Sequence, residues 1–274
     1  MASSKYIRIQ VANTRFAVRC NFPPFMEWLI ERCRNFVSHE KPHLYLKVIL
    51  EQVSDGWNHD HSVTANWNYG KYSELEFKMV CYQPAYIYEY ILHYCLRCAI
   101  ATKHPPDLLL HSAGVIHEGM TYLFIGESGS GKSTVCKLLA QDSTFTILHD
   151  ELVSITKTEQ GFNVWSTPLN GEMPSNHSNS APLKAAFFLK HEQENYAIKL
   201  SGREAARRFA LCLQPPFIVT NGRLEFDAAE SLSMALELVE IIPCYELYFR
   251  PESGFWEVIP PLFYKGFVPA LRKG

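Results

Sequence analysis

Apolar and polar residues alternate along several stretches of the chain before residue 104, a pattern typical of β-strands with one buried face. Residues 7–11 and 16–18 alternate on either side of the turn signal Asn13-Thr14, which predicts a hairpin. The same alternation predicts further strands at 44–50 and 75–81. Apolar residues at helical spacing predict helices over 24–37 and about 84–103.

The pattern changes after residue 104. Short continuous apolar runs, of the kind found in buried strands, now alternate with helical patterns. The runs lie at 108–110, 115–116, 122–125, 145–148, 162–165, 185–189 and 241–249, and the helical patterns at 132–141, 202–212 and 228–240. We therefore predict an N-terminal α+β region over 1–104 and an α/β domain over 105–274, which meet at His104-Pro105-Pro106.

The most informative motif is GESGSGKST at 126–134, between a predicted strand and a predicted helix. It matches G-x-x-x-x-G-K-[ST], in which glycines let backbone N–H groups surround phosphate oxygens at the start of a helix. Lys132 would reach the β- and γ-phosphates, and the Ser133 hydroxyl would bind Mg²⁺. We predict ATP and Mg²⁺ as cofactors, with the nucleotide held by Gly126, Glu127, Ser128, Gly129, Ser130, Gly131, Lys132, Ser133 and Thr134.

A second chemical signal follows at the end of the apolar run 145–148, where Asp150 and Glu151 are adjacent. Acidic residues at the carboxyl end of a strand beside a phosphate loop suit metal binding or proton transfer. The alternative is an ordinary solvated strand end.

The segment LSGREAARR at 200–208 looks like the LSGGQ signature of transporter ATPases. In those proteins the signature precedes the acidic strand, whereas here it follows it. Ser201 is more simply explained as the N-cap of a helix.

Several segments together resemble the HPr kinase/phosphorylase family and, more loosely, the phosphoenolpyruvate carboxykinase fold group. The resemblance covers about 108–250. The segments are LLLHSAGVIHEGMTYLFIGESGSGKST (108–134), ILHDELVSI (147–155), STPLNGEMP (166–174), SAPLKAAFFL (180–189) and IPCYELYF (242–249).

This resemblance implies a P-loop kinase domain of the HPr kinase type and assigns roles to individual residues. Asp150 matches the family's base for the attacking hydroxyl, and His111 and Lys132 would lie beside the transferred phosphate. The metal ligands that it implies are Ser133, Glu151 and Glu172. The second acid is Glu rather than the family's usual Asp, and the glycine-rich signature that docks the HPr carrier is not recognisable, which argues against HPr as the acceptor.

Composition narrows the class of protein. The 274 residues are 47% hydrophobic and 20% charged with a net charge of −2, so no basic field would attract nucleic acid or an anionic membrane. Residues 1–13 lack the apolar core of a secretory signal. The apolar stretch 84–101 carries Glu89, His93 and Arg97, so it predicts a buried helix rather than a membrane span.

Eight scattered cysteines indicate a reducing cytoplasm. Cys95 and Cys98 form a CxxC inside a helical pattern, where we expect small buried residues rather than a zinc or redox site.

We accordingly expect a cytoplasmic ATP-dependent kinase that transfers the γ-phosphate to a hydroxyl, with serine of a peptide, protein or small molecule as the leading acceptor. A nucleotide-gated binding module and a carboxykinase-like enzyme for small acids are the alternatives. We expect residues 1–104 to recognise the acceptor or regulate the enzyme, and to form one wall of the acceptor cleft. The sequence does not determine the oligomeric state and is compatible with a homo-oligomer.

Overall fold

The N-terminal part of the chain forms a five-stranded sheet in the order β1-β2-β3-β5-β4. The inner strands β2, β3 and β5 run parallel to one another, and the outer strands β1 and β4 are antiparallel to β2 and β5 respectively. The elements are β1 (Ile7–Val11), β2 (Thr14–Cys20), α1 (Pro23–Arg32), η1 (Arg34–Phe36), β3 (Leu44–Gln52), β4 (Ser62–Tyr69), β5 (Ser73–Cys81) and α2 (Tyr88–Ala101). This computed structural model describes residues 5–52, 62–69, 73–81, 87–103, 106–169, 171–173, 178–220, 223–226 and 228–263.

Several of the elements predicted from periodicity are present here. The hairpin pairs β1 with β2 through the close pair Val11 and Thr14, and the alternating side chains of β3 and β5 are buried on one face. The first helix ends at Arg32 and continues as the 3-10 turn Arg34–Phe36, earlier than the predicted residue 37. Cys95 and Cys98 are buried in α2, as expected for packing residues.

The C-terminal part forms an eight-stranded sheet in the order β10-β9-β6-β7-β11-β15-β12, with β8 paired to β6. Its elements are β6 (Leu108–His117), β7 (Met120–Ile125), α3 (Lys132–Leu139), β8 (Phe145–His149), β9 (Leu152–Thr158), β10 (Gly161–Trp165), β11 (Ser180–His191), β12 (Tyr196–Lys199), α4 (Gly202–Cys212), β13 (Phe217–Thr220), β14 (Arg223–Phe226), α5 (Ala229–Ile241), β15 (Cys244–Phe249), η3 (Ser253–Val258) and η4 (Pro260–Phe263). The mixed α/β class is therefore confirmed.

The parallel strands of this sheet position the glycine loop. β11 lies between β7 and β15 and runs parallel to both. Parallel strands bring their carboxyl ends to one edge, so the loop that follows Ile125 meets the ends of β11 and β15.

Several predicted strand boundaries differ from the structure, and two of the differences concern the candidate site. The runs 108–110 and 115–116 belong to one strand, β6, because Ser112 and Ala113 are buried and continue the ladder with β7. The acidic segment is instead divided, since β8 ends at His149 and β9 begins at Leu152. Asp150 and Glu151 thus occupy a turn between two strands.

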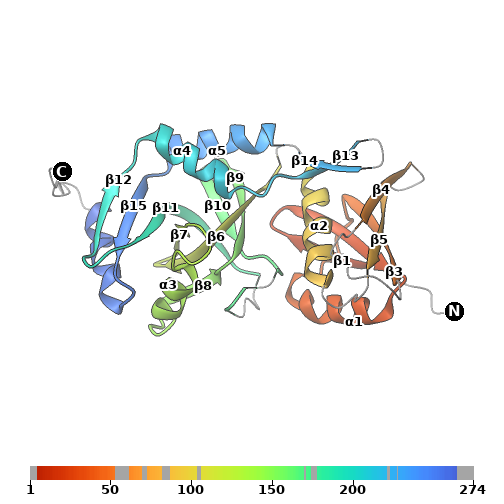
Figure 1. Ribbon diagram of the computed structural model, residues 1–274, viewed down its shortest axis with the longest axis horizontal. Coiled ribbons are helices and arrows are strands. Elements are labelled where there is room, and N and C mark those ends of the chain that lie inside the picture. The colour runs from red at the N-terminus through yellow and green to blue at the C-terminus, as the bar shows by residue number, and fades with distance from the viewer. Residues whose placement is uncertain are drawn as a thin grey trace.

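The two parts lie side by side and share packing (Figure 1). Leu109, Leu152 and Leu169 of the C-terminal part belong to the same buried cluster as the N-terminal core. The β13–β14 hairpin reaches toward the N-terminal sheet (Figure 1). Arg97 of α2 donates from Nε to the Pro215 carbonyl, shortly before β13, at 2.6 Å. The predicted boundary residues His104 and Pro105 lie outside the described residues.

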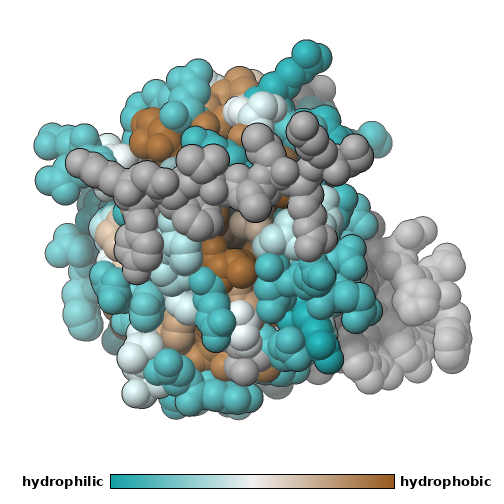
Figure 2. Space-filling model, turned by 90° about the vertical axis from the view of Figure 1, so that its left-hand side faces the viewer, coloured by the Kyte–Doolittle hydropathy of each residue, from teal (hydrophilic) through white to brown (hydrophobic). Residues whose placement is uncertain are grey.

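The surface at the C-terminal end of the molecule is mainly hydrophilic, with hydrophobic residues gathered in a few small groups (Figure 2). No helix in the described part of the chain is both long and apolar enough to cross a membrane.

Candidate functional site

The glycine loop connects β7 to α3 with the backbone that its sequence requires. Gly129 and Gly131 have φ values of +79° and +99°, which side chains of L-residues rarely adopt. A Cβ at Gly131 would lie 2.6 Å from Cζ of Phe249, so this position also requires glycine for space. Helix α3 begins directly after it, with Val135 N–H donating to the Gly131 carbonyl at 2.9 Å.

Lys132 folds back over the loop. Its ammonium donates to the carbonyls of Gly126 at 2.8 Å and Glu127 at 3.1 Å. The side chain is buried, and burial lowers the pKa of the ammonium while the charges of Glu151 and Asp150 act to raise it. Lys132 is therefore a desolvated cation inside the loop, close to both carboxylates of the acidic turn.

His149 holds the acidic turn in place. Its Nδ1 accepts the backbone N–H groups of Glu151 at 2.9 Å and Leu152 at 3.0 Å. An acceptor Nδ1 places the proton on Nε2, which then donates to the Leu169 carbonyl at 2.9 Å. Burial lowers the pKa of His149, in keeping with this neutral tautomer. The histidine before the acidic pair is thus a structural support that sequence inspection did not single out.

Asp150 points into the segment 171–173. Its Oδ2 accepts the backbone N–H groups of Glu172 at 3.1 Å and Met173 at 3.2 Å. Its Oδ1 is buried without a hydrogen-bond partner among the described residues. A Cβ at Gly171 would lie only 2.0 Å from that oxygen, so glycine is needed for the approach.

Glu172 brings the same segment onto helix α3. Its carboxylate accepts from the Lys137 ammonium at 2.5 Å, and this hydrogen bond, with a smaller effect of the nearby Ser133 hydroxyl, lowers the pKa of Glu172. Ser133, Glu172 and the carboxylate of Asp150 therefore lie together at the start of α3. Within the described residues, no three His, Cys, Asp or Glu side chains form a metal-binding cluster.

Glu151 turns the other way, toward β6. Its Oε1 lies 3.1 Å from Nδ1 of His111. Burial and the Lys132 charge lower the pKa of His111, while Glu151 opposes the shift. Of the three predicted metal ligands, Ser133 and Glu172 lie near each other at the start of α3, whereas Glu151 contacts His111.

A pocket of about 350 Å³ opens beside His111 and Glu151. Helix α2 supplies one wall through Glu89, Tyr90 and His93. The other lining residues are Leu152, Leu169 and Gln214. A helix of the N-terminal region thus lines the same pocket as two residues that the sequence analysis had assigned to the site.

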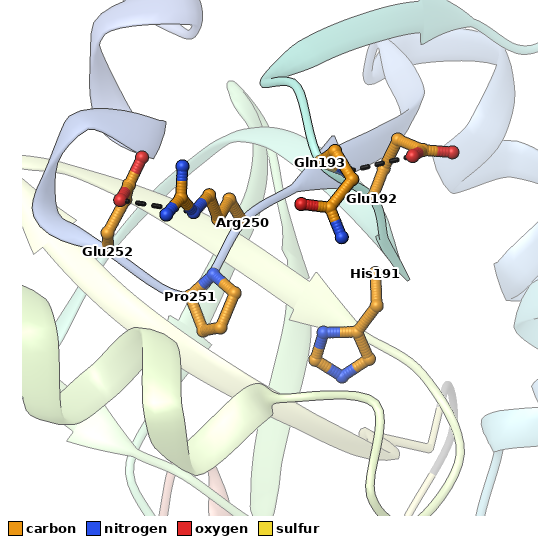
Figure 3. A pocket seen from close by; sticks show the side chains of 6 residues that line it. All are labelled: His191, Glu192, Gln193, Arg250, Pro251 and Glu252. Atoms are coloured by element: carbon orange, nitrogen blue, oxygen red, sulfur yellow. Dashed lines mark hydrogen bonds and ion pairs between the residues drawn. The ribbon is translucent and has the colours of Figure 1, made fainter.

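A second pocket of about 500 Å³ lies at the carboxyl ends of β11 and β15 (Figure 3). It is lined by His191, Glu192, Gln193, Arg250, Pro251 and Glu252. The ring of His191 connects this pocket to the loop, because its Nε2 lies 3.2 Å from the Gly129 carbonyl and the ring stacks on Phe249. The loop therefore has one pocket near His191 and another near His111.

Comparison with known protein families identifies the family of this chain. The family described as "SynChlorMet cassette protein ScmC" matches residues 88–264, which is more than half of the chain. This chain belongs to the ScmC family.

Other comparisons add less to that assignment. Among solved structures, the ScmC-family chain is similar to the Hpr(Ser) kinase/phosphatase from Coxiella burnetii, with 11% identity and a TM-score of 0.26 over 48% of this chain and 93% of that one. A superposition of that quality supports no conclusion about activity. No curated protein matches the chain.

The ScmC match begins at α2 and so includes every residue of the pocket beside His111. Sequence reasoning singled out His111 and Glu151 there, but not Tyr90, Leu169 or Gln214. The missed residues come from elements far apart in the sequence and form no local motif. The helical pattern around Glu89 and His93 was visible, but nothing in it indicated which face meets the acidic turn.

Proposed function

We propose that this ScmC-family protein is an ATP·Mg²⁺-dependent phosphotransferase that moves the γ-phosphate to a hydroxyl group, with serine as the leading acceptor. The observation that carries the proposal is the position of Lys132, which lies in a glycine loop and close to both Asp150 and Glu151. Phosphoryl transfer depends mainly on positioning and charge neutralisation, and these groups suit both tasks.

The loop suits the phosphates of ATP. The carbonyls of Gly126 and Glu127 now hold the Lys132 ammonium, which phosphate oxygens would attract away. The helix α3 that begins beside it adds a positive N-terminal dipole. The pocket of Figure 3 adjoins Gly129 through His191, and we propose that the nucleoside lies there.

Magnesium fits the cluster at the start of α3. The buried Oδ1 of Asp150 lacks a partner among the described residues, and the hydroxyl of Ser133 lies near the carboxylate of Glu172. Hydroxyl and carboxylate oxygens are the ligands that Mg²⁺ prefers. The bound ion would neutralise charge on the phosphates. Because Glu151 faces His111, we assign the ion to Ser133 and Glu172 with Asp150 nearby.

The acceptor would enter the pocket between α2 and the acidic turn. His111 and Glu151 line it, and both adjoin Lys132. We propose that Asp150 is the base for the acceptor hydroxyl and that His111 lies beside the transferred phosphate. Among the described residues, the lining contains no Lys or Arg, which disfavours the carboxykinase-like alternative, since a small acid would need cationic partners.

Acceptor-dependent formation of ADP tests the proposal. The protein is incubated with ATP·Mg²⁺ with and without serine-containing peptides and amino alcohols, and ADP is measured by a coupled assay. A kinase releases ADP faster with an acceptor than without. Binding of ATP with no ADP formed under any condition would support the nucleotide-gated binding module instead.

A further inference from the structure

We propose that Gln214 selects the acceptor, through hydrogen bonds from its side-chain amide to the N–H and C=O of one extended residue at or beside the acceptor hydroxyl. The pocket beside His111, here called the acceptor pocket, would thus take uncharged amides such as a serine within a peptide. This inference rests on the proposed function, because it names the class of acceptor and a specificity-determining residue for the same site.

Both carboxylates that line the acceptor pocket already have partners. The Arg32 Nε lies 3.4 Å from Oε1 of Glu89, and Nδ1 of His111 lies 3.1 Å from Oε1 of Glu151. Burial lowers the pKa of His93 to about 4, so this histidine is neutral near pH 7. A charged acceptor would lose its hydration without meeting an unpaired counter-charge among the described lining residues. An uncharged acceptor would leave the existing pairs in place.

Gln214, by contrast, has hydrogen-bonding capacity to offer a ligand. It is half-buried in the lining, and its side-chain amide makes no hydrogen bond within the part of the chain that the structure describes. A side-chain amide carries one carbonyl acceptor and two N–H donors. In an extended peptide the N–H and C=O of one residue point the same way, as in the paired residues of an antiparallel sheet. Such a residue satisfies the donor and the acceptor of Gln214 together.

The backbone fixes Gln214 beside the strand that carries His111. The Gln214 N–H donates to the Leu109 carbonyl at 2.8 Å, and Leu213 forms an antiparallel bridge with Leu110. Leu110 and Leu213 are buried in the C-terminal core, so the alternation places Gln214 and His111 on the other face, toward the acceptor pocket. Diagonal neighbours in such a register are about 7–8 Å apart. About two extended residues span that separation, so one short segment reaches both side chains.

The size and polarity of the rest of the pocket also favour a short segment. Its volume of about 350 Å³ lies at the small end of ligand pockets. Leu152 and Leu169 are buried and add apolar surface for a small neighbouring side chain. A ligand that lacks hydrogen-bonding groups would cover Gln214 and leave its amide unpaired, which is unfavourable. The pocket therefore discriminates against simple alcohols.

Peptide acceptors in which single amides are replaced test the inference. The parent is acetyl-Ala-Ser-Ala N-methylamide, and three depsipeptides replace the N–H of each residue in turn by an ester oxygen. Binding to the chain saturated with a non-hydrolysable ATP analogue is measured by ligand-observed NMR, and kcat/KM is measured with ATP. Gln214→Met removes the side-chain amide, and Gln214→Glu keeps an oxygen acceptor. Gln160→Met makes the first change in the exposed turn between β9 and β10.

We expect one ester to bind and react about fivefold to tenfold less well than the parent, as one lost hydrogen bond predicts. Gln214→Met should weaken the parent by a similar factor and remove its advantage over that ester. Gln214→Glu should keep the advantage, because its carboxylate still accepts the N–H. Gln160→Met should behave as the wild type.

Single-residue acceptors test the preference for an uncharged compound. N-acetylserine N-methylamide is uncharged, N-acetylserine carries a carboxylate, and serine N-methylamide carries an ammonium. We expect the uncharged compound to bind most tightly of the three. The parent peptide binds more tightly still if the acceptor is a segment of a chain, and equally if it is a small amide. Both results retain the inference.

Equal binding of the parent and all three esters, or an ester effect that persists unchanged in Gln214→Met, overturns the inference. So does tighter binding of a charged single-residue acceptor, or no binding by any of the compounds. Binding with the expected pattern but without phosphate transfer retains the role of Gln214 and rejects the proposed kinase activity. Phosphate transfer that does not depend on Gln214 does the reverse.

Discussion

Replacement of Gly131 by alanine tests the geometry of the loop most sharply. The φ of +99° at Gly131 costs an alanine about 1–2 kcal/mol of strain. In addition, the new Cβ would lie 2.6 Å from Cζ of Phe249. That ring is fully buried and packs against His191 and Phe255, so it has little room to move. Overpacking of this kind costs about 1–3 kcal/mol.

Together these effects predict that Gly131→Ala lowers the free energy of unfolding by about 2–5 kcal/mol. Gly129→Ala is the matched control, because Gly129 has a φ of +79° but no atom within 4 Å of the added Cβ. It should lose only the strain, about 1–2 kcal/mol. Urea denaturation of both variants gives the two values from midpoint and slope.

A double-mutant cycle separates overlap from strain. Phe249→Leu removes the atom that the new Cβ meets, so it should recover part of the loss in Gly131→Ala. Equal destabilisation by Gly129→Ala and Gly131→Ala, together with no coupling to Phe249→Leu, would refute the proposed close approach of β15 to the loop.

Three further predictions concern binding, chemistry and pH. Lys132→Ala should abolish most of the rise in thermal midpoint that ATP·Mg²⁺ produces. The control Lys157→Ala, which changes an exposed lysine paired with Glu237, should keep that rise. An unchanged rise in Lys132→Ala would reject the loop as the ATP site. Asp150→Asn should lower turnover about 100-fold or more with little change in ATP affinity, and a collapse of affinity with normal turnover per bound ATP would make Asp150 a metal ligand only. Because the pKa of His93 falls from 6.5 to about 4 on folding, the unfolded chain binds more protons between these values, so stability should drop by up to about 3 kcal/mol as the pH falls through that window. Denaturation midpoints of the wild type and His93→Gln across that range measure this loss, and equal pH dependence would contradict it.

Local patterns predicted much of the fold. The helix Gly202–Cys212 has the predicted bounds, and its Ser201 caps it by accepting the Glu204 N–H, as the sequence LSGRE indicated. Periodicity and helix caps depend only on residues that are close together in the sequence, so they can be recognised from the sequence alone. The strands β12 and β14 were missed because each has only four residues, too few for a pattern.

The residues of the candidate site were harder to predict from the sequence, for a different reason. The motif residues around Lys132 are contiguous, so the sequence showed them together. The ion pair of Glu172 with Lys137 and the presence of Glu89 in the same pocket as Glu151 depend on how separate elements pack. The order of strands and the position of α2 decide those contacts, and no local pattern encodes them.

Transfer of label from γ-labelled ATP to an acceptor tests phosphotransfer at the glycine loop most directly. The wild-type chain, Lys132→Ala and Asp150→Asn are each given labelled ATP·Mg²⁺ and serine-containing acceptors, and the products are separated. We expect acceptor-bound label with the wild type and little or none with either variant. Label released only as inorganic phosphate, or acceptor labelling that survives in both variants, would contradict phosphotransfer at this loop.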